Sequence, residues 1–264
     1  IPWLYPERIG VTETAFYMHY VRMVRGARCT AFISGQTRWD YVHRIRRSLS
    51  PEAGPVLPLG ADGLDLERQL FSAEKNAWVA VGAINGNKNQ DIIFGAFRQM
   101  WDAGFTGELV MIGRVFGVDS GKWLGEALTY PRFRHLVDVS DEIIRRELRR
   151  ARATIYMSSV EGFGLPPVES LHAGIPVIVT QSIPSIADLP PDGQIRVGDV
   201  TVAAIGDAVQ VTADNVSAAR LWQEASTLQL TTWREFAHRT AAWIRESATA
   251  AAAGPAGSKM RVPS

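Results

Sequence analysis

Cysteine is nearly absent from this chain of 264 residues, which has a single one, Cys29. One thiol excludes an intrachain disulfide and a zinc site built from cysteines, so we expect a reducing, cytoplasmic setting. We also expect Cys29 to be buried and inert just before a strand. An uninterrupted apolar run of about 20 residues, which a membrane-spanning helix needs, is missing as well.

An excess of one charge is also lacking, since 28 Lys and Arg face 27 Asp and Glu. This balance excludes a global field that would favour nucleic acid as a partner. The first residues carry neither an initiator methionine nor a signal-peptide pattern, so we interpret the chain as a piece of a longer protein. The low-complexity stretch 247–264 is expected to be a linker or tail.

Short apolar runs that alternate with longer amphipathic stretches are what the chain does contain, from Val81 onward. This alternation predicts an α/β fold, a Rossmann-like parallel sheet flanked by helices. The expected strands are 30–34, 78–81, 108–112, 135–137, 154–157, 176–180 and 194–197. The expected helices are 13–25, 38–47, 90–103, 141–151, 217–225 and 232–246.

The chain divides at an extended connector, 54–60, whose prolines and glycines suit an interdomain hinge. Residues 1–50 form one αβ unit that is too small to be a domain and is interpreted as a remnant of a preceding lobe. The main domain is expected to span 51–230, and a closing helix 231–246.

The segment 158–180 is the most informative, because it places a Gly-rich loop between a strand and a helix. In a parallel sheet such a loop lies at the carboxyl end of a strand, where α/β folds bind ligands. Glycines allow a ligand to approach the backbone, and the free amides at a helix start bind anions or hydroxyls. Glu161 precedes the loop and Glu169 follows it with seven residues between them, so both carboxylates are expected to reach one crevice.

This pattern, with Gly-Phe-Gly-Leu-Pro inside it and Ala-Gly-Ile-Pro-Val-Ile after it, resembles the signature of glycosyltransferase family four, the group 1 glycosyltransferases. Members of that family are retaining enzymes of the two-lobed GT-B type. The segment 81–89 is similar to the family's Gly-rich strand end and lysine, and 137–141 to its turn beside the nucleobase. The resemblance implies that 51–230 is the C-terminal, nucleotide-sugar-binding domain, and that 1–50 belongs to the acceptor-binding lobe.

The resemblance also implies a role for each matching residue. Glu161 would be the catalytic carboxylate beside the transferred sugar, Lys88 would neutralise the donor diphosphate, and Glu169 would accept the ribose hydroxyls. The remaining donor-binding positions would be Gly82, Val139, Gly162, Phe163, Gly164 and Leu165. These charges suit the chemistry, because cleavage of a glycosyl phosphate leaves negative charge on the diphosphate and positive charge on the sugar.

Neither a metal nor another cofactor is expected, because the sequence contains no Asp-x-Asp pair. Ala83 and Asn87 occupy positions where the family often has arginine, which leaves Lys88 as the one obvious cation of the phosphate site. Three alternatives stay open: the phosphate site is weak, Arg114 rebuilds it, or a residue of the missing lobe completes it.

The function implied is transfer of a hexose, with retention, from a nucleotide sugar to a glycan or lipid-linked acceptor. GDP-mannose is favoured over UDP- and dTDP-linked donors, and peripheral association with the inner face of the plasma membrane is expected. The isolated chain should bind the donor without transferring its sugar. One alternative is a catalytically silent sugar-nucleotide-binding or assembly module. A dinucleotide-dependent oxidoreductase is disfavoured, because no Gly-x-Gly-x-x-Gly follows a strand.

Overall fold

The computed structural model describes residues 11–27, 29–45, 54–117 and 121–252. A six-stranded sheet forms its centre, with the strand order β3-β2-β1-β4-β5-β6 and every neighbouring pair parallel. The strands are β1 (Ala77–Val81), β2 (Glu108–Ile112), β3 (Phe133–Leu136), β4 (Ala151–Tyr156), β5 (Val177–Thr180) and β6 (Gln194–Val197). The predicted α/β, Rossmann-like sheet is confirmed.

Helices cover both faces of this sheet, and others lie away from it. The helices of the described residues are α1 (Val11–Gly26), α2 (Gly35–Asp40), α3 (Gln90–Asp102), α4 (Leu124–Ala127), α5 (Asp141–Arg150), α6 (Leu165–His172), α7 (Pro184–Ala187), α8 (Val202–Ala213), α9 (Asn215–Thr227) and α10 (Trp233–Ala252), with a π-helical turn at Tyr41–Ile45. Apolar residues of α3 and α8 pack on one face, around Trp78, Leu109 and Ile155. Residues of α5 and α9 pack on the other, around Val79 and Val110. The strands β1, β2 and β5 are mostly apolar toward both layers, as expected for the interior of a parallel sheet.

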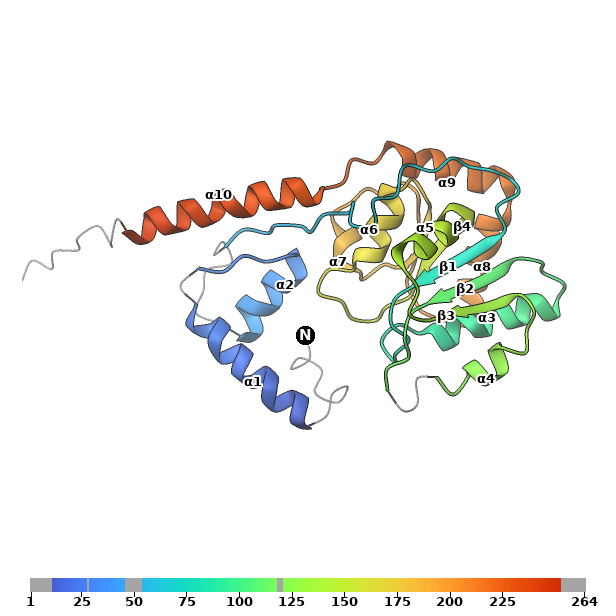
Figure 1. The fold of residues 1–264 in the computed structure, drawn as a ribbon, viewed down its shortest axis with the longest axis horizontal. Helices are drawn as coiled ribbons and strands as arrows, with labels where there is room; N and C mark the ends of the chain where they lie inside the picture. Colours follow the sequence, from blue (N-terminus) through green and yellow to red (C-terminus); the bar gives the residue numbers. More distant parts are fainter. Residues whose placement is uncertain (1–10, 28, 46–53, 118–120, 253–264) are drawn as a thin grey trace, which may run out of the picture.

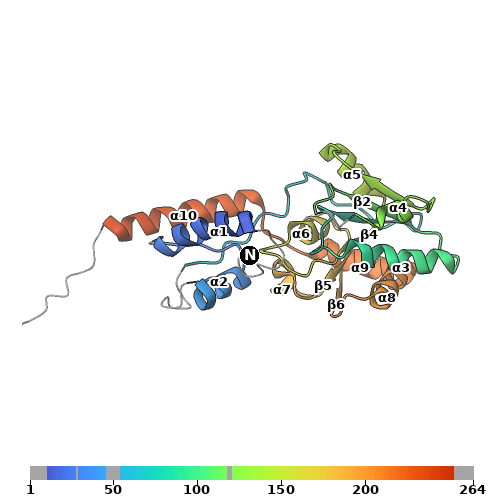
Figure 2. The ribbon, with the colours of Figure 1, turned by 90° about the horizontal axis from the view of Figure 1, so that it is seen from below.

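The molecule has two parts (Figure 1). The sheet and its helices form the larger body, and α1, α2 and the π-helical turn form the smaller one. The last helix, α10, leaves the larger body and extends past the smaller one in both Figure 1 and Figure 2. It continues six residues beyond Glu246, where the sequence predicted its end. In the described part of the chain, no helix combines the length and the apolar character that crossing a bilayer requires.

Strand β4 begins at Ala151, three residues before the predicted start at 154. The early start places the charged Arg152 in a buried strand, at 2% exposure. Its guanidinium group donates to the carbonyl oxygens of Thr212 (2.7 Å) and Ala213 (2.9 Å) and to the side chain of Asn215 (2.7 Å). Because the last carbonyls of α8 lack partners within their own helix, a buried arginine can satisfy them.

Helix α8 is absent from the elements expected from the sequence. Gly206 and several β-branched residues lower the intrinsic helix propensity of its sequence. The tertiary structure overcomes this through burial of Ile205 and Val209 and through Thr201, whose side chain caps the first turn by accepting from the amide of Ala204 at 3.1 Å.

The strand expected at 30–34 is wrong. Only Phe32 forms a parallel bridge, to Val56 of the connector, with backbone bonds of 2.7 and 3.0 Å on either side. A strand needs a longer partner than this connector offers along 30–34 in the described part of the chain. The burial expected for Cys29 is wrong too, because its side chain is exposed in a bend rather than placed before a strand.

Candidate functional site

The candidate site lies at the carboxyl ends of β1 and β4, where the strand order reverses. Two loops that follow these strands are joined there by hydrogen bonds. The amide of Ser159 donates to the carbonyl of Asn87 at 2.7 Å, and the side chain of Asn89 donates to the carbonyl of Met157 at 2.7 Å. Open α/β sheets bind their ligands at such a reversal point, because the two flanking loops diverge to opposite faces.

Lys88 and Glu161, each from one of these loops, form an ion pair between the Lys88 Nζ and Glu161 Oε1 atoms. The same carboxylate oxygen accepts hydrogen bonds from the hydroxyls of Tyr156 and Ser158, both at 2.7 Å. The Lys88 ammonium group also donates to the Tyr156 hydroxyl. The side chains of Lys88 and Glu161 retain 18% and 19% exposure, so the pair stays accessible to a ligand.

Tyr156 and Ser158 are the members of this cluster that the motif argument did not assign to the site. Burial, followed by the negative charge of Glu161, raises the pKa of the Tyr156 phenol well above its usual range. The hydroxyl is therefore a neutral donor at any physiological pH. A hydroxyl-bearing residue at the end of the apolar strand β4 was the available signal, since strand ends carry the ligand-binding side chains of this fold.

Three successive carbonyl groups of the Gly-rich loop are held by serine residues. The hydroxyl of Ser34 donates to the Gly162 carbonyl at 2.7 Å. Ser185 donates its amide to the carbonyl of Phe163 at 2.8 Å and its hydroxyl to that of Gly164 at 2.6 Å. These contacts come from the smaller body and from α7, and they anchor the loop on the side of its carbonyls.

The amides of the same loop point away from these bonds one by one. In a trans peptide the C=O and the N–H of one peptide group point in opposite directions, so each amide of Phe163, Gly164 and Leu165 points away from the serine that holds the carbonyl of its own peptide group. The Phe163 side chain is 7% exposed and packs with Ala61 and Val168. Phe163 can therefore offer a ligand its backbone but not its ring.

Glu169 lies on α6, beside a small cavity whose wall includes Leu64, Val81 and Tyr156. Burial, followed by the negative charge of Asp141, raises the pKa of its carboxyl to about 7. Tyr156 lines this cavity and also bonds Glu161. The two glutamates therefore approach the same tyrosine from different surroundings, a half-buried apolar one for Glu169 and a polar one for Glu161.

The neighbouring strand ends supply Gly82 and Gly113, both with positive φ, at +140° and +148°. A Cβ atom at Gly82 would meet open space, whereas one at Gly113 would overlap the Gly82 carbonyl. Arg114, considered above as a second cation, is exposed and forms an ion pair with Asp138. Val139 packs its side chain against the core beneath the sheet end.

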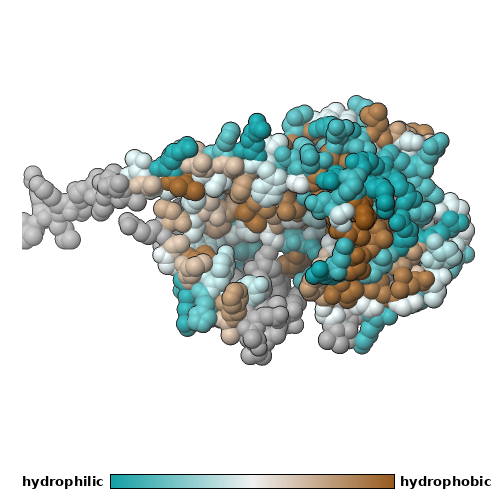
Figure 3. Space-filling view, in the orientation of Figure 1, coloured by the Kyte–Doolittle hydropathy of each residue, from teal (hydrophilic) through white to brown (hydrophobic). Residues whose placement is uncertain are grey.

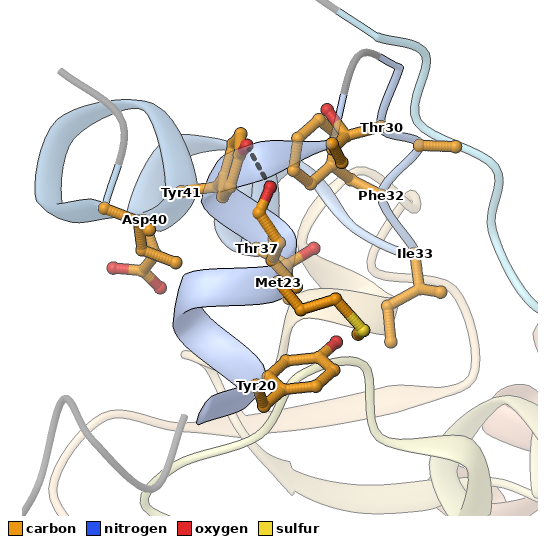
Figure 4. Close-up of a pocket in the computed structure, with 12 residues that line it drawn as sticks. Tyr20, Met23, Thr30, Phe32, Ile33, Thr37, Asp40 and Tyr41 are labelled. Atoms are coloured by element: carbon orange, nitrogen blue, oxygen red, sulfur yellow. Dashed lines mark hydrogen bonds between the residues drawn. The ribbon is translucent and has the colours of Figure 1, made fainter. Parts of the chain in front are cut away.

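A second hollow, of about 420 Å³, lies in the smaller body and is lined largely by apolar side chains of α1, α2 and the segment between them. Figure 4 shows Tyr20, Met23 and Phe32 around it. It contains none of the residues that the resemblance assigned to donor binding. Within the described ranges, no cluster of three His, Cys, Asp or Glu side chains could hold a metal ion.

In comparisons with known proteins, the sequence and the fold of the chain are both similar to those of glycosyltransferases. Residues 65–210, more than half of the chain, match the family described as "Glycosyl transferases group 1". Over 109 residues the chain is 32% identical to the serotype-specific mannosyltransferase WbdA of Escherichia coli. That alignment covers 39% of this chain and 13% of the mannosyltransferase, so the chain spans a small part of the curated relatives it matches.

Solved structures share the fold. Sucrose-phosphate synthase from Thermosynechococcus elongatus superposes with a TM-score of 0.70 at 19% identity, over 88% of this chain and 61% of that one. HepE of Anabaena, solved in complex with UDP and glucose, gives 0.69 at 14% identity, over 83% and 63%. The C-terminal domain of the group 1 protein LpcC from Francisella tularensis gives 0.52 at 16% identity, over 61% and 93%.

Proposed function

The chain belongs to the group 1 glycosyl transferases, and on this premise we propose that it is the donor-binding part of a retaining hexosyltransferase of glycosyltransferase family four. The observation that carries the proposal is the pairing of Lys88 with Glu161 at the point where the strand order of the sheet reverses. A cation and a carboxylate held together there can serve the two charges that develop when a glycosyl phosphate bond breaks.

Lys88 takes the diphosphate in this proposal, and Glu161 lies beside the sugar. The amides of residues 163–165, which face away from the anchored carbonyls, hold sugar hydroxyls and phosphate oxygens. Glu169 accepts the ribose hydroxyls in its ionised form. The transfer needs no metal, because the lysine and the loop amides supply the positive potential that the leaving group requires.

GDP-mannose is the favoured donor, and the support for this choice is the mannosyltransferase named among the relatives. UDP- and dTDP-linked hexoses are the competing donors, since the similar structure of HepE contains UDP and glucose. The acceptor is a glycan or a lipid-linked glycan, which places the enzyme in the cytoplasm, at the inner face of the plasma membrane.

The acceptor lobe is the missing partner of the donor site in this proposal. The chain spans 61% and 63% of two similar solved structures, and α1 exposes large apolar side chains such as Phe16 at 71% and Met23 at 66%. Apolar surface is visible on both bodies in Figure 3. Because transfer requires donor and acceptor to be held together, this chain alone binds the donor and does not transfer the sugar.

The test is a thermal-unfolding screen with GDP, UDP and dTDP, with NAD⁺ as the control ligand. A ligand at 100 times its dissociation constant stabilises the folded state by about 2.7 kcal/mol, so one nucleoside diphosphate should raise the melting temperature clearly. Lys88→Met should reduce the shift by about half or more, because a tenfold loss of affinity leaves about 1.4 kcal/mol of stabilisation at the same ligand concentration. Donor binding would be refuted if NAD⁺ alone raised the melting temperature, or if none of the three nucleoside diphosphates did.

The second candidate is a catalytically silent sugar-nucleotide-binding module. It is favoured by the engagement of Lys88 with Glu161 and of Arg114 with Asp138, which leaves both expected cations paired. Assay of the full-length protein separates the two candidates. Tight donor binding without transfer to any acceptor would support the silent module, and Glu161-dependent transfer would support the enzyme.

A further inference from the structure

Tyr156, the last residue of β4, connects the two ions of the site. Its hydroxyl donates to Glu161 at 2.7 Å and accepts from the Lys88 ammonium group. The Lys88 Nζ atom also lies 4.4 Å from the centre of the tyrosine ring, a distance at which a cation is attracted to the aromatic face. One side chain thus contacts Lys88 in two ways and Glu161 in one.

The ring is fixed by the core rather than by the ions. Tyr156 is 6% exposed and packs with Leu171, Val177 and Val179, so its ring cannot follow a moving lysine. Only its hydroxyl end reaches the polar cluster. A rigid aromatic donor at this position can therefore define where a flexible lysine and a loop carboxylate come to rest.

We propose that Tyr156 is a positioning residue of the donor site, whose ring holds Lys88 and whose hydroxyl orients Glu161; the inference rests on the proposed function. When a diphosphate arrives, Lys88 turns toward it and leaves Glu161, while the ring face continues to attract the ammonium group. Glu161 keeps the hydrogen bonds from Tyr156 and Ser158 and so stays in place beside the sugar.

Two substitutions separate the roles of the ring and the hydroxyl. Tyr156→Phe keeps the ring and removes the hydroxyl, whereas Tyr156→Leu removes both. Tyr41→Phe is the control, because it removes the hydroxyl of another buried tyrosine, which donates to the Val24 carbonyl at 3.0 Å in the smaller body. Circular dichroism and thermal unfolding verify that each variant is folded.

Calorimetry with GDP and GDP-mannose, and with UDP and UDP-glucose, measures the two roles. We expect the affinity of Tyr156→Phe for the nucleoside diphosphate to stay within about twofold of wild type. The gain in affinity that the sugar brings should be about tenfold smaller than in wild type, which is the effect of one hydrogen bond to a charged group. Tyr156→Leu should lower the affinity for the diphosphate itself by about fivefold. Tyr41→Phe should change neither quantity.

The outcomes distinguish the inference from its premise. If wild type binds none of the four ligands, the proposed function is wrong and this inference is overturned with it. If wild type binds, three results overturn the inference alone. The first is that the sugar adds no affinity in wild type, and the second is that Tyr156→Phe behaves like Tyr41→Phe. The third is that each Tyr156 variant loses as much affinity for the nucleotide as for the nucleotide sugar.

Discussion

Ser34 and Gly162 lie 128 residues apart in the chain, and the Ser34 hydroxyl donates a 2.7 Å hydrogen bond to the Gly162 carbonyl oxygen. The same hydroxyl oxygen accepts from the amide of Thr37 at 3.1 Å and so begins α2. Ser34 is 3% exposed. One buried side chain of the smaller body therefore caps a local helix and anchors the Gly-rich loop of the larger body.

Replacing this serine should affect both stability and donor binding. Ser34→Ala removes a helix cap and a buried hydrogen bond, so we expect urea unfolding to show a loss of about 1–2 kcal/mol. It should also weaken GDP binding, because the loop loses one of its anchors. Thr37→Val is the control, since it disturbs the same cap and leaves the bond to Gly162. Equal weakening of GDP binding by both variants would contradict the anchoring role.

The ion pair between Lys88 and Glu161 makes Glu161 a competitor of the diphosphate. Glu161→Gln removes the competing charge and should tighten GDP binding by up to about fivefold, the scale of a partly exposed ion pair. Lys88→Met should weaken GDP binding by at least about tenfold. In the double variant, calorimetry should give the affinity of Lys88→Met alone. Weaker GDP binding by Glu161→Gln would show that the carboxylate does not compete.

The raised pKa of Glu169 predicts how stability depends on pH. The carboxyl has a pKa of about 7 when folded, because of burial and of Asp141, and about 4.3 when unfolded. Between these values the folded state binds more protons than the unfolded state. The stabilisation is thus complete below about pH 4.3 and is lost as the pH rises through 7, with an upper limit of roughly 4 kcal/mol. The free energies of unfolding of wild type and Glu169→Gln, measured at pH 5 and pH 8, test this. The same change in free energy between the two pH values in both proteins would contradict the prediction.

Donor binding should depend on the same group in the opposite direction. If ionised Glu169 accepts the ribose hydroxyls, GDP affinity should rise between pH 6 and pH 8 in wild type and stay level in Glu169→Gln. Guanosine supplies the ribose without the diphosphate, so its affinity should follow the same trend. A guanosine affinity that falls over this range would place the ribose elsewhere.

The two strand-end glycines should respond differently to alanine. Gly113→Ala places a Cβ against the Gly82 carbonyl at a φ of +148°, so we expect a fold that is severely destabilised. Gly82→Ala meets open space and carries only the cost of its φ of +140°, about 1–2 kcal/mol. It should fold and lose donor affinity, because the methyl group enters the candidate site. Thermal unfolding and GDP titration of the two variants test these expectations. Equal destabilisation of Gly113→Ala and Gly82→Ala would contradict them.

Much of the fold follows from local patterns in the sequence. The strands β1, β2 and β5 are short, mostly apolar runs, and neighbouring residues suffice to mark them, since both faces of a parallel sheet are buried. Pro166, Pro167 and Gly174 likewise mark the start and end of α6. Local patterns did not predict the inclusion of Arg152 in β4 or the helix α8, because long-range contacts compensate there for locally unfavourable residues.

The candidate site divides in the same way. Glu161, Glu169 and the loop between them follow from one continuous motif, because the residues that build a strand, a turn and a helix start are adjacent in the chain. Tyr156 meets Lys88 across 68 residues, and Ser34 meets Gly162 across 128. Those contacts exist only because parallel pairing places β1 beside β4 and packing sets the smaller body against the loop, and no local propensity encodes such distances.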